Sequence, residues 1–390
     1  MIPVSQALDE LFNLVSPLDI EHVALRDANN RVLAQTQYAT RTQPPFAASS
    51  MDGYAVKGAE VEDDCMFKVI GESAAGHGWD GTVGAGQAVR IFTGAPVPQG
   101  ADFVVIQEDV KVRGNLITLG RDIGPKDNIR PAGVDFLEGD PMTAPRTLQP
   151  ADIALLASMN IAQVPVYRRP IVALISTGDE LVMPGQTPKP DQIIASNTFG
   201  LAAMLENLGA HPRILPIARD NESSLRTAFD LAKGADLVIT IGGASVGDHD
   251  LVAPVAAELG MEQSFYKVAM RPGKPLMAGK LGDMAMVGLP GNPVSAMVCG
   301  TVFIAPMIRA MLGLGQSASP QRSVALSAPI GANGPREHYM RGFADANGVH
   351  SADQQDSSLL SVLSQSNVLI VRPPNDPARN IVECVNVMDI

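Results

Sequence analysis

The sequence has few cysteines, few aromatic residues and no excess of basic charge. Cys65, Cys299 and Cys384 are too few and too widely spaced for a disulfide framework or a thiolate metal cluster, which favours a reducing cytoplasmic location. One tryptophan and 4% aromatic residues leave little surface for stacking on bases, and a net charge of −12 opposes contact with phosphate backbones. The composition therefore predicts a protein that binds no nucleic acid.

The first residues lack the basic start and apolar core of an export signal, and no uninterrupted apolar segment reaches the length of a membrane span. We therefore expect a soluble cytoplasmic protein that does not associate with a membrane. The chain does contain 46% hydrophobic and 18% charged residues over 390 positions, which is enough to bury substantial cores. That length predicts about two to four domains.

The spacing of apolar residues divides the chain into regions. Residues 3–16 fit an amphipathic helix that Ser5 can cap, and residues 41–140 contain short alternating runs typical of a small β-rich domain. From residue 170, strands alternate with helices, a pattern that predicts a mostly parallel sheet covered by helices. Pro306 should interrupt the last of these helices. Residues 321–390 return to short strands and predict a C-terminal β-domain.

Three loops in the α/β region are rich in glycine and proline and follow predicted strands. They span residues 242–250, 271–275 and 288–293. Because glycine lets backbone N–H groups approach a ligand closely, such loops suit phosphate or another oxyanion. Asn292 can cap the helix that follows, with Pro293 in its first turn and unpaired N–H groups facing outward. Four basic residues and no acidic one lie between positions 263 and 282, which predicts a pocket for a small anion.

Several acidic and polar motifs allow both a structural and a functional interpretation. Residues 176–180 place hydroxyl groups, a glycine and two carboxylates after a strand, which fits either turn chemistry or a ligand site. Asp248 and Asp250 can bind a divalent cation, although Asp250 can also cap the next helix. His249 has no partner at ligand spacing, so we interpret it as a surface residue.

The basic residues of the second loop favour ligand contact. Lys267, Arg271 and Lys274 are interleaved with prolines and a glycine that restrict the backbone, so an anion clamp is a better interpretation than a solvated loop. Asp52 and Thr93 each lie next to a turn at the edge of a short apolar run. Taken singly, they indicate ordinary turns.

Taken together, seven segments resemble the molybdopterin molybdenumtransferases, the molybdenum insertase family that includes the E-domain of gephyrin. The segments are residues 51–56, 93–98, 130–135, 176–180, 242–250, 271–275 and 288–293. The resemblance implies a multidomain α/β plus β fold. Its expected parts are an elongated N-terminal dimerisation module at 1–45 and 140–169, an inserted β-rich domain at 46–139, a molybdopterin-binding α/β domain with a mostly parallel sheet at 170–318, and a small C-terminal β-domain at 319–390.

The resemblance also implies an activity and its partners. The reaction transfers molybdenum from molybdate to adenylylated molybdopterin, releases AMP and requires Mg²⁺. The protein is implied to be a homodimer whose cleft combines the α/β domain of one subunit with the first two modules of the other. Further implied partners are the molybdopterin adenylyltransferase and acceptor molybdoenzymes. Two alternatives stay open at this point: a non-catalytic molybdopterin-binding scaffold, and the adenylyltransferase activity itself.

The same resemblance assigns roles to individual residues. The implied catalytic residues are Asp52, Thr93, Glu180, Asp220 and Asp250, and the four carboxylates among them are the implied Mg²⁺ ligands. The residues implied to bind the pterin and nucleotide phosphates are Ser176, Thr177, Gly178, Asp179, Gly242, Gly243, Ser245, Gly247, Lys267, Arg271, Lys274, Pro290, Gly291, Asn292, Pro293 and Ser295. Arg341 and Ser357 are the implied hydrogen-bonding partners of molybdate.

The chain departs from the family pattern at a few positions. Ile194 and Ala195 stand where an aromatic and an acidic residue are expected, Ala244 stands where valine is usual, and Arg271 replaces a frequent lysine. The change to arginine keeps the charge but alters the geometry of the donors. These departures leave the choice between molybdate and tungstate open.

Overall fold

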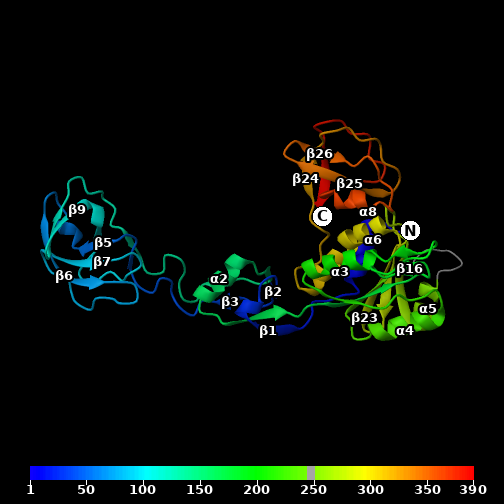
Figure 1. The fold of residues 1–390 in the computed structure, drawn as a ribbon, viewed down its shortest axis with the longest axis horizontal. Helices are drawn as coiled ribbons and strands as arrows, with labels where there is room; N and C mark the ends of the chain where they lie inside the picture. Colours follow the sequence, from blue (N-terminus) through cyan, green and yellow to red (C-terminus); the bar gives the residue numbers. More distant parts are fainter. Residues whose placement is uncertain (244–250) are drawn as a thin grey trace. The chain divides into compact units, whose positions relative to one another are not determined.

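The computed structural model describes residues 1–243 and 251–390. It forms two compact units (Figure 1). The first unit contains Met1–Glu21, Asn30–Ala34 and Val166–Ile390, and the second contains His22–Asn29 and Gln35–Pro165. The chain passes between the units within β1 (Ile20–Ala24) and β14 (Gln163–Tyr167), and on either side of β2 (Val32–Leu33).

The second unit is built around a six-stranded sheet in the order β8-β5-β7-β6-β10-β9. These strands are β5 (Gly53–Val56), β6 (Met66–Ser73), β7 (Gln87–Ile91), β8 (Phe103–Ile106), β9 (Val110–Arg113) and β10 (Leu116–Leu119). Alternate residues such as Phe67, Ala88 and Ile117 are buried in one core, which is why the short alternating runs of the sequence form strands. This confirms the predicted β-rich region.

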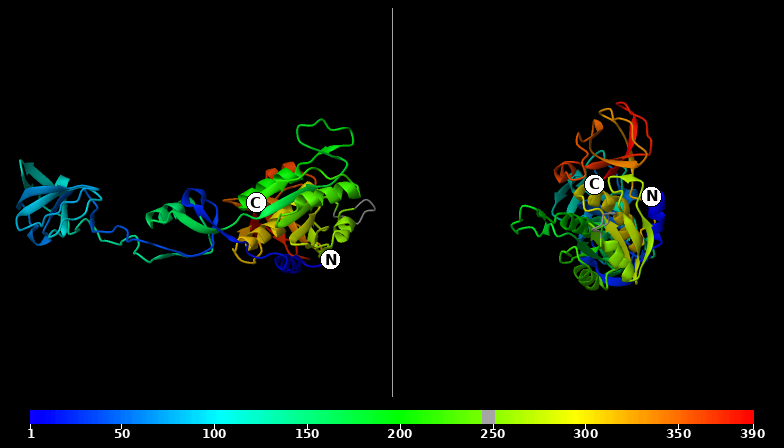
Figure 2. Two further views of the ribbon diagram at one scale, coloured as in Figure 1. Left: turned by 90° about the horizontal axis from the view of Figure 1, so that it is seen from below. Right: turned by 90° about the vertical axis from the view of Figure 1, so that its right-hand side faces the viewer.

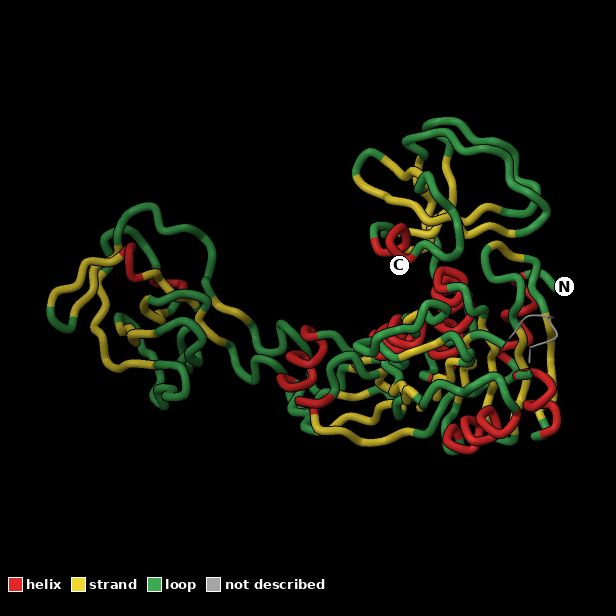
Figure 3. The backbone as a smooth tube through the Cα atoms, turned by 45° about the vertical axis from the view of Figure 1, so that its right-hand side comes forward, coloured by secondary structure: helices red, strands yellow, loops and turns green. Residues whose placement is uncertain are grey.

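Short elements complete the second unit. The strand pairs are β4 (Ala48–Ser49) with β11 (Ile129–Arg130) and β3 (Gln37–Tyr38) with β12 (Pro141–Met142). The others are η1 (Leu25–Asp27), η2 (Gly58–Glu60), η3 (Gln107–Asp109), β13 (Arg146–Thr147) and α2 (Pro150–Ser158). A reciprocal capping arrangement between Gln149 and Asp152 begins α2 at Pro150. Figure 3 shows that this unit consists mainly of strands and loops.

The first unit contains a second six-stranded sheet, in the order β18-β15-β19-β23-β22-β20. Its strands are β15 (Ile171–Ser176), β18 (His211–Ile214), β19 (Leu237–Ile241), β20 (Met261–Tyr266), β22 (Met277–Leu281) and β23 (Met284–Leu289). The pairs among β18, β15, β19 and β23 are parallel, and β22 is antiparallel to both β23 and β20. Therefore β22 alone runs against the other five strands, and the prediction of a mostly parallel sheet is confirmed.

Helices cover both faces of this sheet. Val172 and Leu174 of β15 pack in one core with α1 (Val4–Phe12), α3 (Asn197–Asn207) and the helical segment α6 (Pro293–Cys299), η4 (Gly300–Ile304) and α7 (Ala305–Met311). Ala173 and Ile175 pack on the other face against α4 (Glu222–Ala232) and α5 (Val252–Glu258). A central strand with both faces covered requires the continuous apolar run that this sequence has.

The C-terminal part of the first unit is a third sheet, in the order β21-β25-β27-β28-β24, with β26 paired to β25. Its elements are β21 (Met270–Arg271), β24 (Arg322–Ala325), β25 (Glu337–Asp345), β26 (Gly348–Ser351), β27 (Val368–Arg372) and β28 (Cys384–Asp389), together with α8 (Leu360–Ser364). The predicted C-terminal β-domain is confirmed. Tyr339 and Leu369 of this sheet are buried in the same core as α1 and α3, so the two parts of the unit pack together.

Some local predictions need correction. Helix α1 begins at Val4, so Ser5 lies inside the helix and Pro3 occupies the capping position. The alternation of strands and helices did not predict strand β22, which lies between β23 and β20. The basic loop at 271–275 begins within β21, whose Arg271 pairs with His338 of β25.

The last helix of the α/β region is interrupted as predicted. Pro306 follows the π-helical turn η4, which separates α6 from α7. A proline has no N–H to donate and clashes with the carbonyl four residues earlier, so a wider turn at this point accommodates it. Among the described residues, Pro293–Met311 is long and apolar enough to cross a membrane by composition, but 83% of its apolar window is buried inside the protein. The apolar side chains of this segment are buried in the core of the first unit.

Candidate functional site

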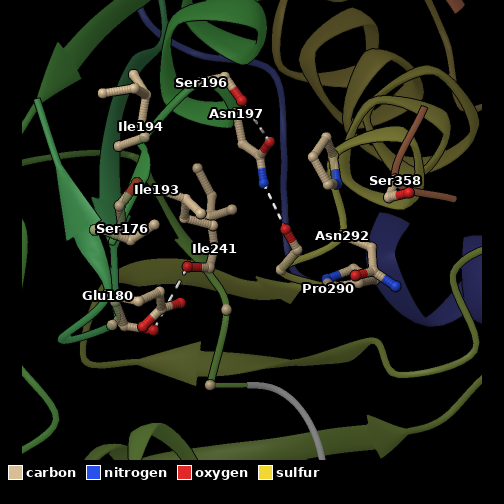
Figure 4. A pocket seen from close by; sticks show the side chains of 18 of the residues that line it. Ser176, Glu180, Ile193, Ile194, Ser196, Asn197, Ile241, Pro290, Asn292 and Ser358 are labelled. Carbon is tan, nitrogen blue, oxygen red and sulfur yellow. Dashed lines mark hydrogen bonds between the residues drawn. The ribbon is translucent and has the colours of Figure 1, made fainter. Parts of the chain in front are cut away.

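A pocket of about 880 Å³ opens at the carboxyl ends of β15, β19 and β23 (Figure 4). This is the edge at which α/β sheets commonly bind ligands. Of the residues assigned from the sequence, the pocket is lined by Ser176, Thr177, Gly178, Glu180, Asp220, Gly242, Gly243, Pro290, Gly291, Asn292 and Pro293. The fold therefore brings the loops at 242–243 and 290–293 and the 176–180 motif to one place, and the 271–275 loop adds Pro275.

The glycines after β19 allow the backbone to turn into the pocket. Gly242 and Gly243 have φ angles of +91° and +62°, in the region that favours glycine. A Cβ atom at Gly243 would lie 2.3 Å from Cγ2 of Val252, so the close approach of α5 also requires glycine. A Cβ atom at Gly291 would lie 3.5 Å from Cα of Gly242, which shows how closely the two loops approach each other.

The start of α6 differs from the sequence-based interpretation. Asn292 does occupy the capping position and Pro293 the first turn, as predicted. However, the Asn292 side chain donates to Oγ of Ser357 at 3.0 Å, and the Val294 N–H donates to the Ser357 carbonyl at 3.0 Å. The first free N–H of the helix is thus bound by the C-terminal sheet region, which corrects the expectation that the N–H groups face outward.

Two carboxylates line the pocket beside a tightly held turn. Glu180 and Asp220 lie on the loops after β15 and β18. Asp179 and Asp220 each donate a backbone N–H to the carboxylate of the other, both at 3.3 Å. Nη1 of Arg219 donates to the carbonyls of residues 178, 179 and 181 at 3.0–3.3 Å. These bonds fix the backbone that carries Glu180.

The hydroxyls of the 176–180 motif are engaged within the fold. Ser176 is buried and its Oγ is hydrogen-bonded to Oγ1 of Thr198. Thr177 is also buried, and its Oγ1 makes a long contact of 3.5 Å to the carbonyl of Ile241. These residues shape the floor of the pocket, while the two carboxylates lie at its exposed side.

The predicted cations lie near this edge but outside the pocket lining. Lys267 has its Nζ 5.1 Å from the centroid of the Tyr266 ring, and Arg271 and Lys274 are exposed. In the described part of the chain, Pro275 is the residue of this loop that lines the pocket. Asp179 and Ser295 also lie outside the lining, and Ser295 is buried in α6.

The C-terminal sheet region contributes a wall through the loop before α8 and the first residue of that helix. Ser358 and Leu360 line the pocket, and the Ser358 hydroxyl and N–H both donate to Oδ1 of Asp356. These two bonds hold the pKa of Asp356 below its usual value. Arg341 is buried, and its guanidinium donates to Oε1 of Gln355 and to the Asp356 carbonyl, the latter at 2.6 Å. In this structure Arg341 therefore supports the loop that carries Ser357 and Ser358.

Several lining residues were assigned no binding role by the sequence analysis. Asn197 donates from Nδ2 to the carbonyl of Gly291 at 2.7 Å and so ties α3 to the loop after β23. Ser196 lies beside it, and Ile193 and Ile194 form an apolar wall on β17 (Figure 4). Strand β17 (Ile193–Ile194) pairs with β16 (Leu181–Val182), and residues 183–192 between them loop away from the sheet (Figure 2, left). The sequence signal that could have indicated this part of the lining is the polar pair Ser196–Asn197 at the start of α3.

Asp52 and Thr93 come together in the second unit although they are far apart in sequence. The backbone N–H and the hydroxyl of Thr93 both donate to Oδ1 of Asp52, each at 2.8 Å. These two bonds, with the nearby positive charge of Arg90, lower the pKa of Asp52. Arg90 is itself held over the rings of Tyr54 and Phe92, at 4.9 and 4.7 Å from their centroids. Asp52 is therefore a firmly ionised carboxylate.

The predicted metal ligands are not assembled within the described residues. No group of three or more His, Cys, Asp or Glu side chains in residues 1–243 and 251–390 is placed to hold a metal ion. Glu180 and Asp220 share the pocket, whereas Asp52 belongs to the other unit. Asp250, Ser245 and Gly247, together with Ala244, Asp248 and His249, lie outside the described residues. Carboxylate oxygens are the ligands that Mg²⁺ prefers, so Glu180 and Asp220 fit part of such a site.

Fold and pocket together define a multidomain ligand-binding protein, in which an α/β domain presents glycine loops and two carboxylates beside a C-terminal β-sheet. Comparison with protein families specifies it further. The "MoeA N-terminal region (domain I and II)" matches residues 2–160, the "Probable molybdopterin binding domain" matches residues 173–310, and the "MoeA C-terminal region (domain IV)" matches residues 323–390.

Individual relatives agree with these matches over nearly the whole chain. A molybdopterin molybdenumtransferase of Nostoc sp. is 37% identical over 398 residues, which cover 96% of this chain and 90% of that protein. The Haemophilus influenzae protein of the same name is 36% identical over 385 residues, covering 95% and 94%. A solved molybdopterin biosynthesis moeA protein of Pyrococcus horikoshii superposes with a TM-score of 0.85 at 26% identity and covers 100% of both chains. The chain belongs to the molybdopterin molybdenumtransferase (MoeA) family.

Proposed function

We propose that this chain transfers molybdenum from molybdate to adenylylated molybdopterin, with release of AMP, during biosynthesis of the molybdenum cofactor. The observation that carries the proposal is the pocket, where two glycine loops and two carboxylates meet in a chain related over 95–96% of its length to named molybdopterin molybdenumtransferases. Loop N–H groups suit phosphate oxygens, and carboxylates suit a divalent cation that offsets the negative charge of a phosphoanhydride.

The proposed roles follow the chemistry of each group. The loops at Gly242–Gly243 and at 290–293 bind phosphate oxygens of the substrate, and the apolar wall of Ile193 and Ile194 faces its ring system. Lys267, Arg271 and Lys274 attract the anionic substrates through their positive charge, and Ser357 forms a hydrogen bond with molybdate. The geometry supports a positioning role for Arg341, because its donors are used by Gln355 and the Asp356 carbonyl.

Magnesium dependence is part of the proposal. Glu180 and Asp220 would hold the ion, with Asp52 and Asp250 as further ligands. When bound, Mg²⁺ offsets the negative charge that builds up as the phosphoanhydride of the substrate is cleaved. The bond from the Asp179 N–H holds the Asp220 carboxylate, and the three carbonyl contacts of Arg219 hold the backbone that carries Glu180.

The proposal includes a cytoplasmic homodimer. In a dimer, the Asp52–Thr93 pair of one subunit would serve the pocket of the other. Asp52 would then add a third carboxylate to Glu180 and Asp220, the two in the described lining. Three cysteines, all free, suit a reducing compartment. The adenylyltransferase and acceptor molybdoenzymes are the proposed functional partners.

The test is an assay with purified protein, adenylylated molybdopterin, molybdate and Mg²⁺, followed by measurement of AMP and of active cofactor. We expect both products, loss of both with a chelator, and a decrease of about 100-fold or more for Glu180→Gln and Asp220→Asn. Glu206→Gln, an exposed residue of α3, is the matched control and should retain activity. Absence of AMP release and of active cofactor with the unmodified protein would refute the proposal. ATP-dependent adenylylation of molybdopterin would indicate the adenylyltransferase instead.

A further inference from the structure

A second cavity of about 870 Å³ lies in the first unit, and we call it the groove. It lies among α3, the α6–α7 segment and α8, and the end of β28 closes one side. Its apolar lining is formed by Met204, Leu208, Met297, Val298, Leu360, Leu363, Leu369 and Met388. It shares Ser196, Asn197 and Leu360 with the pocket, but its remaining lining is separate. The volume is typical of small-molecule sites, which span about 300–1,000 Å³.

Arg309 of α7 gives the groove a positive charge. Its Nε atom is buried and has no hydrogen-bond partner in the described part of the chain. A buried donor of a charged group that lacks an acceptor is costly, and such a group calls for an explanation. Other shielded arginines are paired: Arg372 binds Asp376, and Arg168 binds Asp236 at 2.6 Å. Arg309 therefore differs in lining an apolar cavity while its buried Nε donor has no partner among the described residues.

Several other polar groups of the groove already have partners within the fold. The carboxylate of Asp389 accepts from Arg322 at 2.8 Å, so it is engaged by another cation. The Ser319 hydroxyl donates to the carbonyl of Thr301 at 2.7 Å, and the Thr301 hydroxyl donates to the carbonyl of Met297 at 3.2 Å. Thr301 lies in η4, and π-helical turns of this kind occur often at functional sites. The charge of Arg309 is thus left for a ligand.

We propose that the groove binds a small amphipathic anion of the medium-chain carboxylate type. Its apolar chain lies along the methionine and leucine side chains, and its carboxylate accepts hydrogen bonds from Arg309. Methionine side chains adapt to ligands of different shape, which suits a chain without fixed geometry. The proposal does not depend on the molybdenum-transfer reaction, because Arg309 and most of the groove lie outside the pocket.

The experiment is calorimetric titration of the full-length protein with decanoate, compared with uncharged decanol. We expect one saturable site per chain for decanoate and at least about tenfold weaker binding of decanol, since a charge-assisted hydrogen bond is lost. Arg309→Met removes the charge and keeps an apolar stem, so it should weaken decanoate binding at least about tenfold while leaving decanol binding unchanged. Arg113→Met, an exposed arginine of β9, is the matched control and should bind decanoate normally.

A second variant tests the location independently of Arg309. Ala203 is exposed and lines the groove, so Ala203→Trp should fill it without disturbing the core and should abolish saturable binding. Equal decanoate affinity in the wild type and in either variant would overturn the proposal, as would non-saturable binding to the wild type. A change of oligomeric state with Ala203→Trp would assign the groove to a second copy of the chain, and would also overturn it.

Discussion

Replacement of Gly178 by alanine tests how the 176–180 turn presents Glu180. Gly178 has a φ angle of +146°, a backbone conformation that residues with a side chain rarely adopt. A Cβ atom at this position would lie 2.4 Å from Oε2 of Glu180 and 2.7 Å from its Cδ atom. Glycine at 178 thus allows both the turn and the folded-back position of the Glu180 carboxylate.

Two separable effects follow from adding this methyl group. The backbone strain should lower the free energy of unfolding by about 1–3 kcal/mol. The carboxylate must also move by about 1 Å to reach an ordinary contact distance of 3.4 Å, and because it is the end of a flexible side chain this movement costs little stability. A displacement of about 1 Å at a reacting centre can reduce the rate on the order of 100-fold. We therefore expect modest destabilisation with severe loss of molybdenum transfer.

Two other glycines separate these effects experimentally. Gly185 has a φ angle of +89° and open space around its Cβ position, so Gly185→Ala should show the strain alone. Gly331 has open space and no positive φ, so Gly331→Ala should change stability by less than about 0.5 kcal/mol. Urea denaturation followed by circular dichroism gives the free energies, and AMP release gives the activities. If Gly178→Ala is as active as Gly185→Ala, the reasoning about Glu180 is wrong.

Two further predictions concern protonation. Thr93→Val removes the hydroxyl donor and keeps the backbone N–H, so the pKa of Asp52 should rise toward its usual value in a carboxyl NMR titration. Thr93→Ser should preserve the low pKa, and an unchanged pKa in Thr93→Val would contradict the assignment. Burial, and then the charge of Arg271 and neighbouring arginines, lowers the pKa of His338 to about 4 from 6.5. Below pH 6.5 the unfolded chain therefore binds a proton at this histidine that the folded chain does not bind. The free energy of unfolding is unaffected by His338 above that pH and falls by on the order of 3 kcal/mol as the pH approaches 4. His338→Gln should flatten this loss in urea denaturations at pH 7 and 4.5, and an equally steep loss in the variant would refute it.

Local structure was predictable where short-range signals agree. Helix α4 has such signals, because Asn221 caps it by accepting from the Ser224 N–H and its apolar residues recur at helical spacing. Strand β19 is a continuous apolar run, and Gly209, with a φ of +87°, follows the end of α3. The family resemblance then organised the motifs into a single expected site.

Other features could not be predicted from short segments. Strand β22 contains Gly279 and Lys280, which are more typical of loops than of strands. It forms because it pairs with β20 on one side and with β23 on the other. Arg341 and Ser357 belong to segments whose local sequence does not distinguish a ligand contact from a supporting one. The structure shows Arg341 bonded to Gln355, 14 positions away, and Ser357 bonded to Asn292, 65 positions away.

The sequence by itself determined the residue types of the site and the backbone conformations that they allow. Glycines stand where φ is positive, carboxylates follow the strands, and a proline begins α6. These are local properties, set by steric limits within a few residues. The tertiary structure decided which of them meet. Asp52 reaches Thr93 across 41 positions and Asn197 reaches Gly291 across 94, and such contacts form because burial of the sheet faces brings distant loops together. That collective packing, rather than any local pattern, decided that Asn197 and Ser358 line the pocket while Lys267, Arg271 and Lys274 lie outside its lining.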